Sequence, residues 1–197
     1  MSRDSYRTLA APATFRHKIE RSDFLGLAFA TSSDDAFFAA LKQVEKEDFD
    51  ATHHCWAFRL FDGRQRSSDA GEPSGTAGKP ILGAIESADL YDTGVVVVRW
   101  FGGVKLGTGG LSRAYRDTAA QTLAAAETVE RFVYATYAVD VPCDAMSTVY
   151  RLVDPPNVFI DREHFGERNV FTVKVRLSRT AEFERALAER RLPFTPR

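Results

Sequence analysis

The chain has 197 residues, and its 26 Lys and Arg residues nearly balance its 27 Asp and Glu residues, giving a formal net charge of −1. This balance excludes a protein that is basic as a whole, so any contact with nucleic acid must come from a local patch. The two cysteines, Cys55 and Cys143, argue against a disulfide framework, and the first residues lack the apolar core of a signal peptide. With no apolar run near the about 20 residues of a membrane helix, we expect a globular cytoplasmic protein without a membrane segment.

The first two thirds of the chain predict strands and helices in alternation. The spacing of Phe37, Leu41 and Val44 is helical, and Ser33 precedes this segment as a cap. The four valines at 95–98 leave no polar side, which is typical of a strand buried on both faces. In chain order the predicted elements are strands 14–18 and 24–31, helix 34–46, strand 52–61, helix 81–88, strand 93–101 and helix 111–127.

Strand 52–61 alternates in character, with bulky side chains on one face. His54, Trp56, Phe58 and Leu60 share that face, and we expect it to be the core face. The opposite face carries His53, which we expect near the glycine-rich loops described below.

After residue 131 the pattern starts again. The predicted elements are strand 132–141, helix 145–153, a turn at 154–156, strands 157–160 and 169–177, and helix 181–191. This order fits a small βαββα or βαββαβ sandwich. We therefore place a domain boundary near Arg131, giving domains 1–131 and 132–197.

Two glycine-rich loops, at 71–80 and 102–110, each precede a predicted helix. Between Arg99 and Arg116 there are four cations and no Asp or Glu. A helix N-terminus already carries positive potential, so cations beside it favour an anionic ligand. Glycines let the backbone turn its N–H groups toward such a ligand. Because both loops begin helices beside the same buried strand, we expect them to converge into one basic cleft.

We interpret three groups of residues as the anion-binding or RNA-binding site. The cations are Lys79, Arg99, Lys105, Arg113 and Arg116. The loop glycines are Gly75, Gly78, Gly102, Gly103, Gly107, Gly109 and Gly110. The nearby polar side chains are those of His53, Glu72, Ser74 and Thr76. The alternative is that the glycines only make tight turns and the arginines are solvated or paired with Asp117 and Glu72.

Other chemistry fits the sequence less well. A Walker A loop needs Ser or Thr where Pro80 follows Lys79, and a dinucleotide fingerprint needs a third glycine where Ser112 stands. His53 and Cys55 share a strand face, but a structural zinc site needs about four ligands. We therefore expect no metal, no cofactor and no catalytic residue, neither a Cys55 nucleophile nor a Glu72 base. Trp100 and Phe101 could stack on bases, although strand parity places Trp100 in the core.

Several segments resemble the signature blocks of the IMPACT/YigZ family. They are DAGEPSGTAGKPIL at 69–82, VVVVRWFGGVKLGTGGLSRAY at 95–115 and, more loosely, ATHHCWAFRL at 51–60 and KIERSDFLG at 18–26. The resemblance implies an α+β protein of two domains. The N-terminal domain would be of ββαβα type, similar to the second domain of a ribosomal protein and to domain IV of elongation factor G. The C-terminal domain would be ferredoxin-like, similar to domain V of that factor.

The resemblance also implies a role in translation. Folds of this kind suggest binding to RNA or the ribosome, and eukaryotic relatives regulate translation. The leading hypothesis is thus a non-enzymatic RNA-binding or ribosome-binding translational regulator, or a partner of a protein of the translation machinery. Two alternatives stay open. One is a nucleotide-binding enzyme, similar to small-molecule kinases, that uses the glycine-rich loops; the other is a protein-interaction adaptor.

Overall fold

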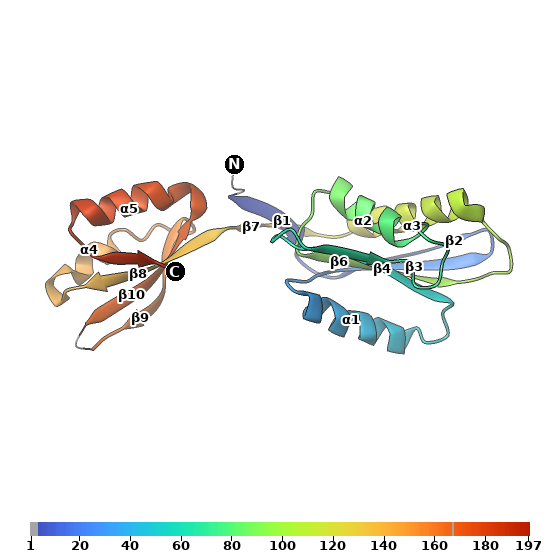
Figure 1. Ribbon diagram of the computed structural model, residues 1–197, viewed down its shortest axis with the longest axis horizontal. Helices are drawn as coiled ribbons and strands as arrows, with labels where there is room; N and C mark the ends of the chain where they lie inside the picture. Colours follow the sequence, from blue (N-terminus) through green and yellow to red (C-terminus); the bar gives the residue numbers. More distant parts are fainter. Residues whose placement is uncertain (1–3, 167) are drawn as a thin grey trace. The chain divides into compact units, whose positions relative to one another are not determined.

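The computed structural model describes residues 4–166 and 168–197. The chain forms two compact units, one of residues 6–131 and the other of residues 132–197 with Asp4 and Ser5. It passes between them twice, in β1 (Ser5–Leu9) and β7 (Thr128–Phe132), which pair as a two-stranded sheet. Both units mix helices and strands (Figure 1), so the predicted α+β class is confirmed. Neither β1 nor β7 was predicted as a separate strand.

A five-stranded sheet forms the centre of the first unit. Its strands lie in the order β2-β3-β6-β4-β5, and every neighbouring pair is antiparallel. The central strand is buried on both faces as predicted, since the side chains of Val95, Val96, Val97 and Val98 are fully buried. The bounds are β2 (Ala13–Ile19), β3 (Ser22–Ala30), β4 (His53–Arg59), β5 (Gln65–Ser68) and β6 (Thr93–Trp100).

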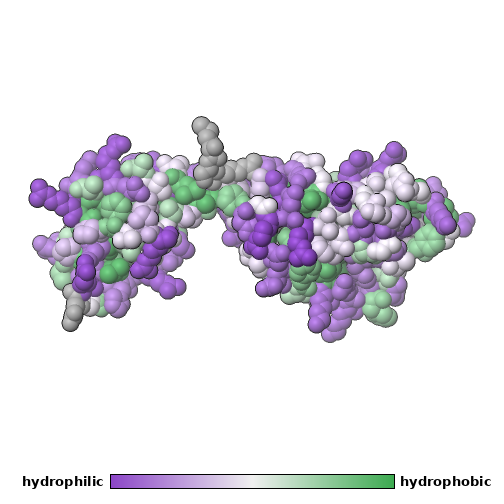
Figure 2. Space-filling view, viewed as in Figure 1, coloured by the Kyte–Doolittle hydropathy of each residue, from purple (hydrophilic) through white to green (hydrophobic). Residues whose placement is uncertain are grey.

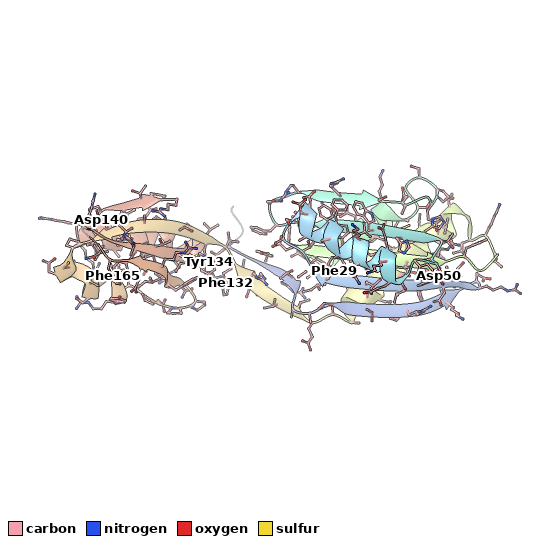
Figure 3. All side chains as sticks on the ribbon, turned by 90° about the horizontal axis from the view of Figure 1, so that it is seen from below. Phe29, Asp50, Phe132, Tyr134, Asp140 and Phe165 are labelled. Atoms are coloured by element: carbon pink, nitrogen blue, oxygen red, sulfur yellow. The ribbon has the colours of Figure 1, made fainter. Side chains whose placement is uncertain are left out.

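Helices cover both faces of this sheet. Helix α1 (Asp34–Glu47) packs on one face, and α2 (Gly78–Ser87) and α3 (Gly107–Ala124) pack on the other (Figure 1). The Ser33 hydroxyl accepts the N–H of Ala36 and caps α1, as predicted. Phe37 packs among Phe29, Trp56 and Phe58 under α1, and Figure 3 shows Phe29 beside that helix.

The structure adds one finding to the predictions for the first unit and corrects one of them. Strand β4 is buried on both faces, because Cys55 and Ala57 are as fully buried under α2 and α3 as Phe58 is under α1. Helix α3 begins at Gly107, one turn before the predicted residue 111. Gly107, Gly109 and Gly110 of the second loop therefore lie in the first turn of a helix, where N–H groups point out of its end.

The second unit is a ferredoxin-like sandwich, and the βαββαβ order is the correct one. Its sheet has the order β11-β8-β10-β9 around a core that includes Val139, Phe171 and Leu187. Helix α4 is shorter than predicted, because the N–H groups of Leu152 and Val153 bond to carbonyl oxygens three residues back instead of four. Asp154 precedes Pro155, and a residue before proline disfavours the helical conformation. The bounds are β8 (Tyr134–Val141), α4 (Met146–Tyr150), β9 (Val158–His164), β10 (Asn169–Arg176), α5 (Thr180–Glu189) and β11 (Phe194–Pro196).

No helix within residues 4–166 and 168–197 is both long enough and apolar enough to span a membrane.

Candidate functional site

The two glycine-rich loops meet at one end of the five-stranded sheet, as predicted. The antiparallel register puts Arg99 of β6 opposite His53 of β4 and Phe24 of β3. The loop after β5 returns beside His53, whose Nδ1 lies 2.9 Å from the carbonyl oxygen of Ala70. Its next turn places Glu72 in hydrogen-bond contact with Arg99. We call this end, formed by residues 69–78 and 99–110, the loop end of the sheet.

The N-terminus of α2 already has an anion, which the chain itself supplies. One carboxylate oxygen of Asp69 accepts the N–H groups of Ala77 at 2.9 Å and Gly78 at 2.8 Å, and the other accepts that of Gly75 at 2.7 Å. Burial raises the pKa of Asp69, but these backbone hydrogen bonds outweigh it and leave the pKa below its usual value. The structure therefore corrects the interpretation of Gly75 and Gly78 as donors to an external anion.

Replacing Asp69 by alanine should lower the free energy of unfolding at pH 7 by about 2 kcal/mol, the upper end for a lost helix cap. Because the pKa of Asp69 is lowered in the folded protein, its contribution is present above the unfolded pKa and is lost as the pH falls through the folded pKa. Urea unfolding of both proteins at neutral pH and below pH 4 measures this. A difference that stays constant down to the most acidic sample contradicts the assignment.

A buried ion pair lies at the centre of the loop end. Arg99 Nη1 is 2.6 Å from Glu72 Oε1, and the two side chains are 5% and 3% exposed. The same Oε1 accepts the hydroxyl of Tyr115 at 2.7 Å, and Arg99 Nη2 donates to Ser22 at 3.2 Å. Arg99 is thus a buried partner of Glu72 rather than a free phosphate contact, which corrects its predicted role. His53 completes the group, with Nε2 3.8 Å from Glu72 Oε1.

Cys55 lies beneath this ion pair and donates its thiol to the carbonyl oxygen of Asp69 at 2.9 Å. Burial raises the pKa of Cys55 to about 12, so at neutral pH the thiolate that a nucleophile needs is scarce. Burial likewise raises the pKa of Tyr115. Within the described part of the chain, no cluster of three or more His, Cys, Asp or Glu side chains could hold a metal ion.

Both loops line one pocket of about 410 Å³. Its polar residues include His53, Glu72 and Arg99, and its walls include the apolar side chains of Phe101, Leu106 and Leu111. Phe101 is 45% exposed, and the guanidinium carbon of Arg99 lies 5.3 Å from the centroid of its ring. The pocket is more apolar than the predicted basic cleft, and of the predicted cations only Arg99 and Lys105 line it.

The N-terminus of α3 differs from that of α2, because no side chain of the described residues caps it. Leu106 stands at the cap position, and the first turn contains no acidic residue. The N–H groups of a first turn have no partner within the helix. Lys105 and Arg113 are exposed here, and neither lies within 4.0 Å of a carboxylate among residues 4–166 and 168–197.

The glycines of the second loop have different structural roles. A Cβ on Gly102 would lie 2.0 Å from the carbonyl oxygen of Arg21, so close packing of backbone requires glycine there. Gly103 and Gly107 have φ angles of 86° and 69°, which favour glycine. Gly109 has neither constraint, since nothing lies within 4 Å of a Cβ at that position.

The other predicted site residues lie around this centre. Thr76 is buried and donates to the carbonyl oxygen of Pro73, which is a structural role. Ser74 and Lys79 are exposed beside the first loop, and Gly110 lies in the first turn of α3.

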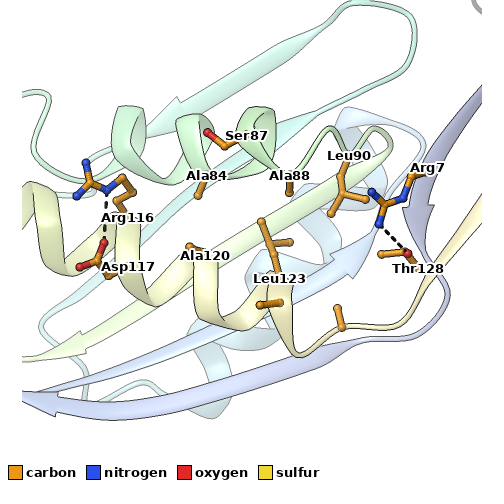
Figure 4. A pocket seen from close by; sticks show the side chains of 12 residues that line it. Arg7, Ala84, Ser87, Ala88, Leu90, Arg116, Asp117, Ala120, Leu123 and Thr128 are labelled. Carbon is orange, nitrogen blue, oxygen red and sulfur yellow. Dashed lines mark hydrogen bonds and ion pairs between the residues drawn. The ribbon is translucent and has the colours of Figure 1, made fainter.

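Arg116 lies away from the loop-end pocket, in a separate groove of about 510 Å³ between α2 and α3. There it pairs with Asp117 at 3.4 Å, as the alternative interpretation proposed, and Figure 4 shows both side chains with Ala84, Ala88 and Ala120 along the groove. The surface over the two helices is pale in Figure 2, as expected for helices rich in alanine and glycine. The prediction that Arg116 belongs to the same anion-binding site is therefore wrong.

The Impact N-terminal domain family matches residues 20–123, just over half of the chain and including both glycine-rich loops. The chain belongs to the Impact family. IMPACT family member YigZ of Escherichia coli is 31% identical over 190 residues, covering 94% of this chain and 93% of the relative. An IMPACT family member of Thermus thermophilus is 37% identical over 160 residues, covering 80% of this chain and 86% of the relative.

Solved structures also resemble this chain. A crystal structure described as a hypothetical protein is 29% identical and covers 98% of this chain and 97% of that chain, with a TM-score of 0.75. The structure of Yih1, described as a two-domain translational regulator, covers 59% of this chain and 46% of that chain at 27% identity. Its TM-score is 0.37. The resemblance seen in the sequence blocks is thus confirmed.

Proposed function

We propose that the loop end binds single-stranded RNA and that the protein is a non-enzymatic, translation-related regulator that acts on RNA or the ribosome. The observation that carries this proposal is the first turn of α3, which has neither a side-chain cap nor an acidic residue. Lys105 precedes this turn and Arg113 follows it, both exposed. Unpartnered N–H groups beside two cations suit a phosphate of a nucleic-acid backbone.

An aromatic ring beside the cations supports RNA over a free anion. Phe101 is 45% exposed and lines the pocket that opens next to the first turn of α3. Proteins that bind single strands combine a positive groove with exposed aromatic rings on which bases stack. By contrast, Trp100 donates to Asp50, which follows α1 (Figure 3), and packs in the core under α1. Phe101 is therefore the stacking candidate of the pair.

The kinase-like alternative needs carboxylates near the loops to bind Mg²⁺. Phosphoryl transfer requires Mg²⁺ and carboxylates to hold it. The nearby carboxylates are those of Asp69, which accepts three backbone N–H groups, and Glu72, which pairs with Arg99. Asp69 is thus used at the start of α2, and the charge of Glu72 is balanced by Arg99. This favours a binding module over an enzyme that transfers phosphate.

Lys105→Ala and Arg113→Ala should each weaken binding to a short single-stranded RNA. Each should also lower the slope of log affinity against log salt concentration by about 0.7, because each removes about one phosphate contact. Fluorescence anisotropy over a salt series measures both quantities. Stability should change by at most about 0.5 kcal/mol, since both side chains are exposed.

Lys42→Ala is the matched control. Lys42 is also exposed, but it lies on α1, across the sheet from the loop end. Its replacement should leave the affinity and the salt slope as in the wild type. If all three variants show the wild-type slope, or if Lys42→Ala has the largest effect, the loop end is not the RNA contact.

A further inference from the structure

The fold leaves two polar atoms of the central ion pair without a partner. Glu72 Oε1 accepts both Arg99 and Tyr115, while no hydrogen bond within the described residues reaches Glu72 Oε2. The Nε N–H of Arg99 is buried and also lacks an acceptor in that part of the chain. Both residues line the pocket of the loop end. Because folded proteins leave few buried polar atoms unpaired, the unpaired N–H of Arg99, on the same ion pair as the free oxygen of Glu72, indicates a ligand edge that supplies their complements.

The shape of the pocket suits a flat, largely apolar group. Its volume of about 410 Å³ lies within the usual range of small-molecule sites. Phe101, Leu106 and Leu111 form apolar walls above the charged residues. A nucleobase has this combination of an apolar face and a polar edge, and the first turn of α3 lies next to the pocket, where it can receive the attached phosphate.

We infer that one unpaired base of the bound RNA enters this pocket and that Glu72 and Arg99 select guanine. The inference rests on the proposed RNA binding and adds base selectivity to it. The Watson–Crick edge of guanine carries two adjacent N–H donors, which match the free carboxylate oxygen of Glu72, and beside them the O6 acceptor, which matches the free N–H of Arg99. Uracil offers one N–H between two carbonyl oxygens, and those oxygens repel a carboxylate.

The test compares short oligouridines that differ at one central nucleotide. The wild type should bind the oligonucleotide with a central guanosine about tenfold more tightly than the all-uridine one, within the discrimination usual for a bidentate base contact. Inosine lacks the N2 amine of guanine, so it should retain only about a threefold gain, half of the effect on a logarithmic scale. This comparison needs no change to the protein.

Two variants test which residues read the base. Glu72→Gln exchanges one acceptor oxygen for a donor, so it should bring the guanosine-to-uridine ratio of affinities close to one. Since Glu72 is buried against Arg99, this variant is first checked for folding by circular dichroism. Phe101→Ala removes an apolar wall whose ring centroid also lies 5.3 Å from the guanidinium carbon of Arg99, and it should reduce the ratio at least threefold, because a purine loses more stacking than uracil. Lys42→Ala should keep the wild-type ratio.

The outcomes separate the base pocket from RNA binding itself. Equal wild-type affinity for the guanosine and all-uridine oligonucleotides contradicts the inferred base pocket but is compatible with the proposed RNA binding. Tighter binding of adenosine or cytidine than of guanosine at the central position overturns the assignment of guanine. If no oligonucleotide binds at low salt, the proposed function fails, and the base pocket fails with it.

Discussion

Replacing Arg99 by methionine should lower the free energy of unfolding by about 3–5 kcal/mol, the usual cost of removing one partner of a buried ion pair. The change leaves the carboxylate of Glu72, 3% exposed, with the hydroxyl of Tyr115 as its remaining hydrogen-bond donor among the described residues. The carboxylate then loses its arginine partner in an environment that solvates it poorly. Urea unfolding at pH 7, followed by circular dichroism, measures the change.

Two further variants control this prediction. Arg99→Met combined with Glu72→Gln removes both charges, so it should recover most of the lost stability. Arg16→Met breaks an ion pair with Asp23 that is equally close, at 2.7 Å, but Arg16 is 56% exposed. It should cost at most about 1 kcal/mol. Equal losses for Arg99→Met and Arg16→Met would show that the central pair is solvated.

Gly102→Ala should lower the free energy of unfolding by about 3 kcal/mol, at the upper end for overpacking. A Cβ at this position would lie 2.0 Å from the carbonyl oxygen and 2.2 Å from the carbonyl carbon of Arg21. These are backbone atoms, so no side-chain rotation can relieve the clash. The contact joins the end of β6 to the turn before β3, and thermal unfolding should report its loss.

Gly109→Ala is the matched control for the same loop. Nothing lies within 4 Å of a Cβ on Gly109, and the residue stands in the first turn of α3. Alanine should therefore raise the free energy of unfolding by about 0.4–1 kcal/mol, because it restricts the unfolded chain. If Gly109→Ala proves as destabilising as Gly102→Ala, the separation of packing glycines from open ones is wrong.

Local pattern was sufficient for the elements with strong periodicity. Helix α1 was predicted with its cap because Ser33 and the spacing of Phe37, Leu41 and Val44 are local signals. Strand β6 was predicted because its valines leave no polar face. Strand β5 was missed because all of its four residues are polar, and an edge strand of this kind owes its position to pairing with β4.

The burial of both faces of β4 could not be predicted from the strand alone. Cys55 and Ala57 are small, so they look like a solvent face beside Trp56 and Phe58. Small residues here let α2 pack closely on the sheet. On β3, Gly26 has the same effect for α3, since a Cβ on it would lie 2.0 Å from Thr122 Oγ1.

The pairing of charged groups in the candidate site could not be predicted from local sequence. The sequence predicted that both helix starts attract an anion, but it could not tell whether the chain itself supplies one. Asp69 occupies the start of α2, and Glu72 pairs with Arg99, 27 residues further along the chain. Only the tertiary structure separates these groups, which pair within the fold, from Lys105 and the first turn of α3.

Amide hydrogen exchange with and without a short single-stranded RNA tests the central claim most directly. In the free protein, the N–H groups of Gly107, Thr108 and Gly109 should exchange fast because the first turn of α3 has no cap. RNA should slow their exchange and that of Lys105, while α1 exchanges as before. Unchanged exchange at the first turn of α3 in a saturated complex, or protection confined to α1 or to residues 132–197, would contradict the account.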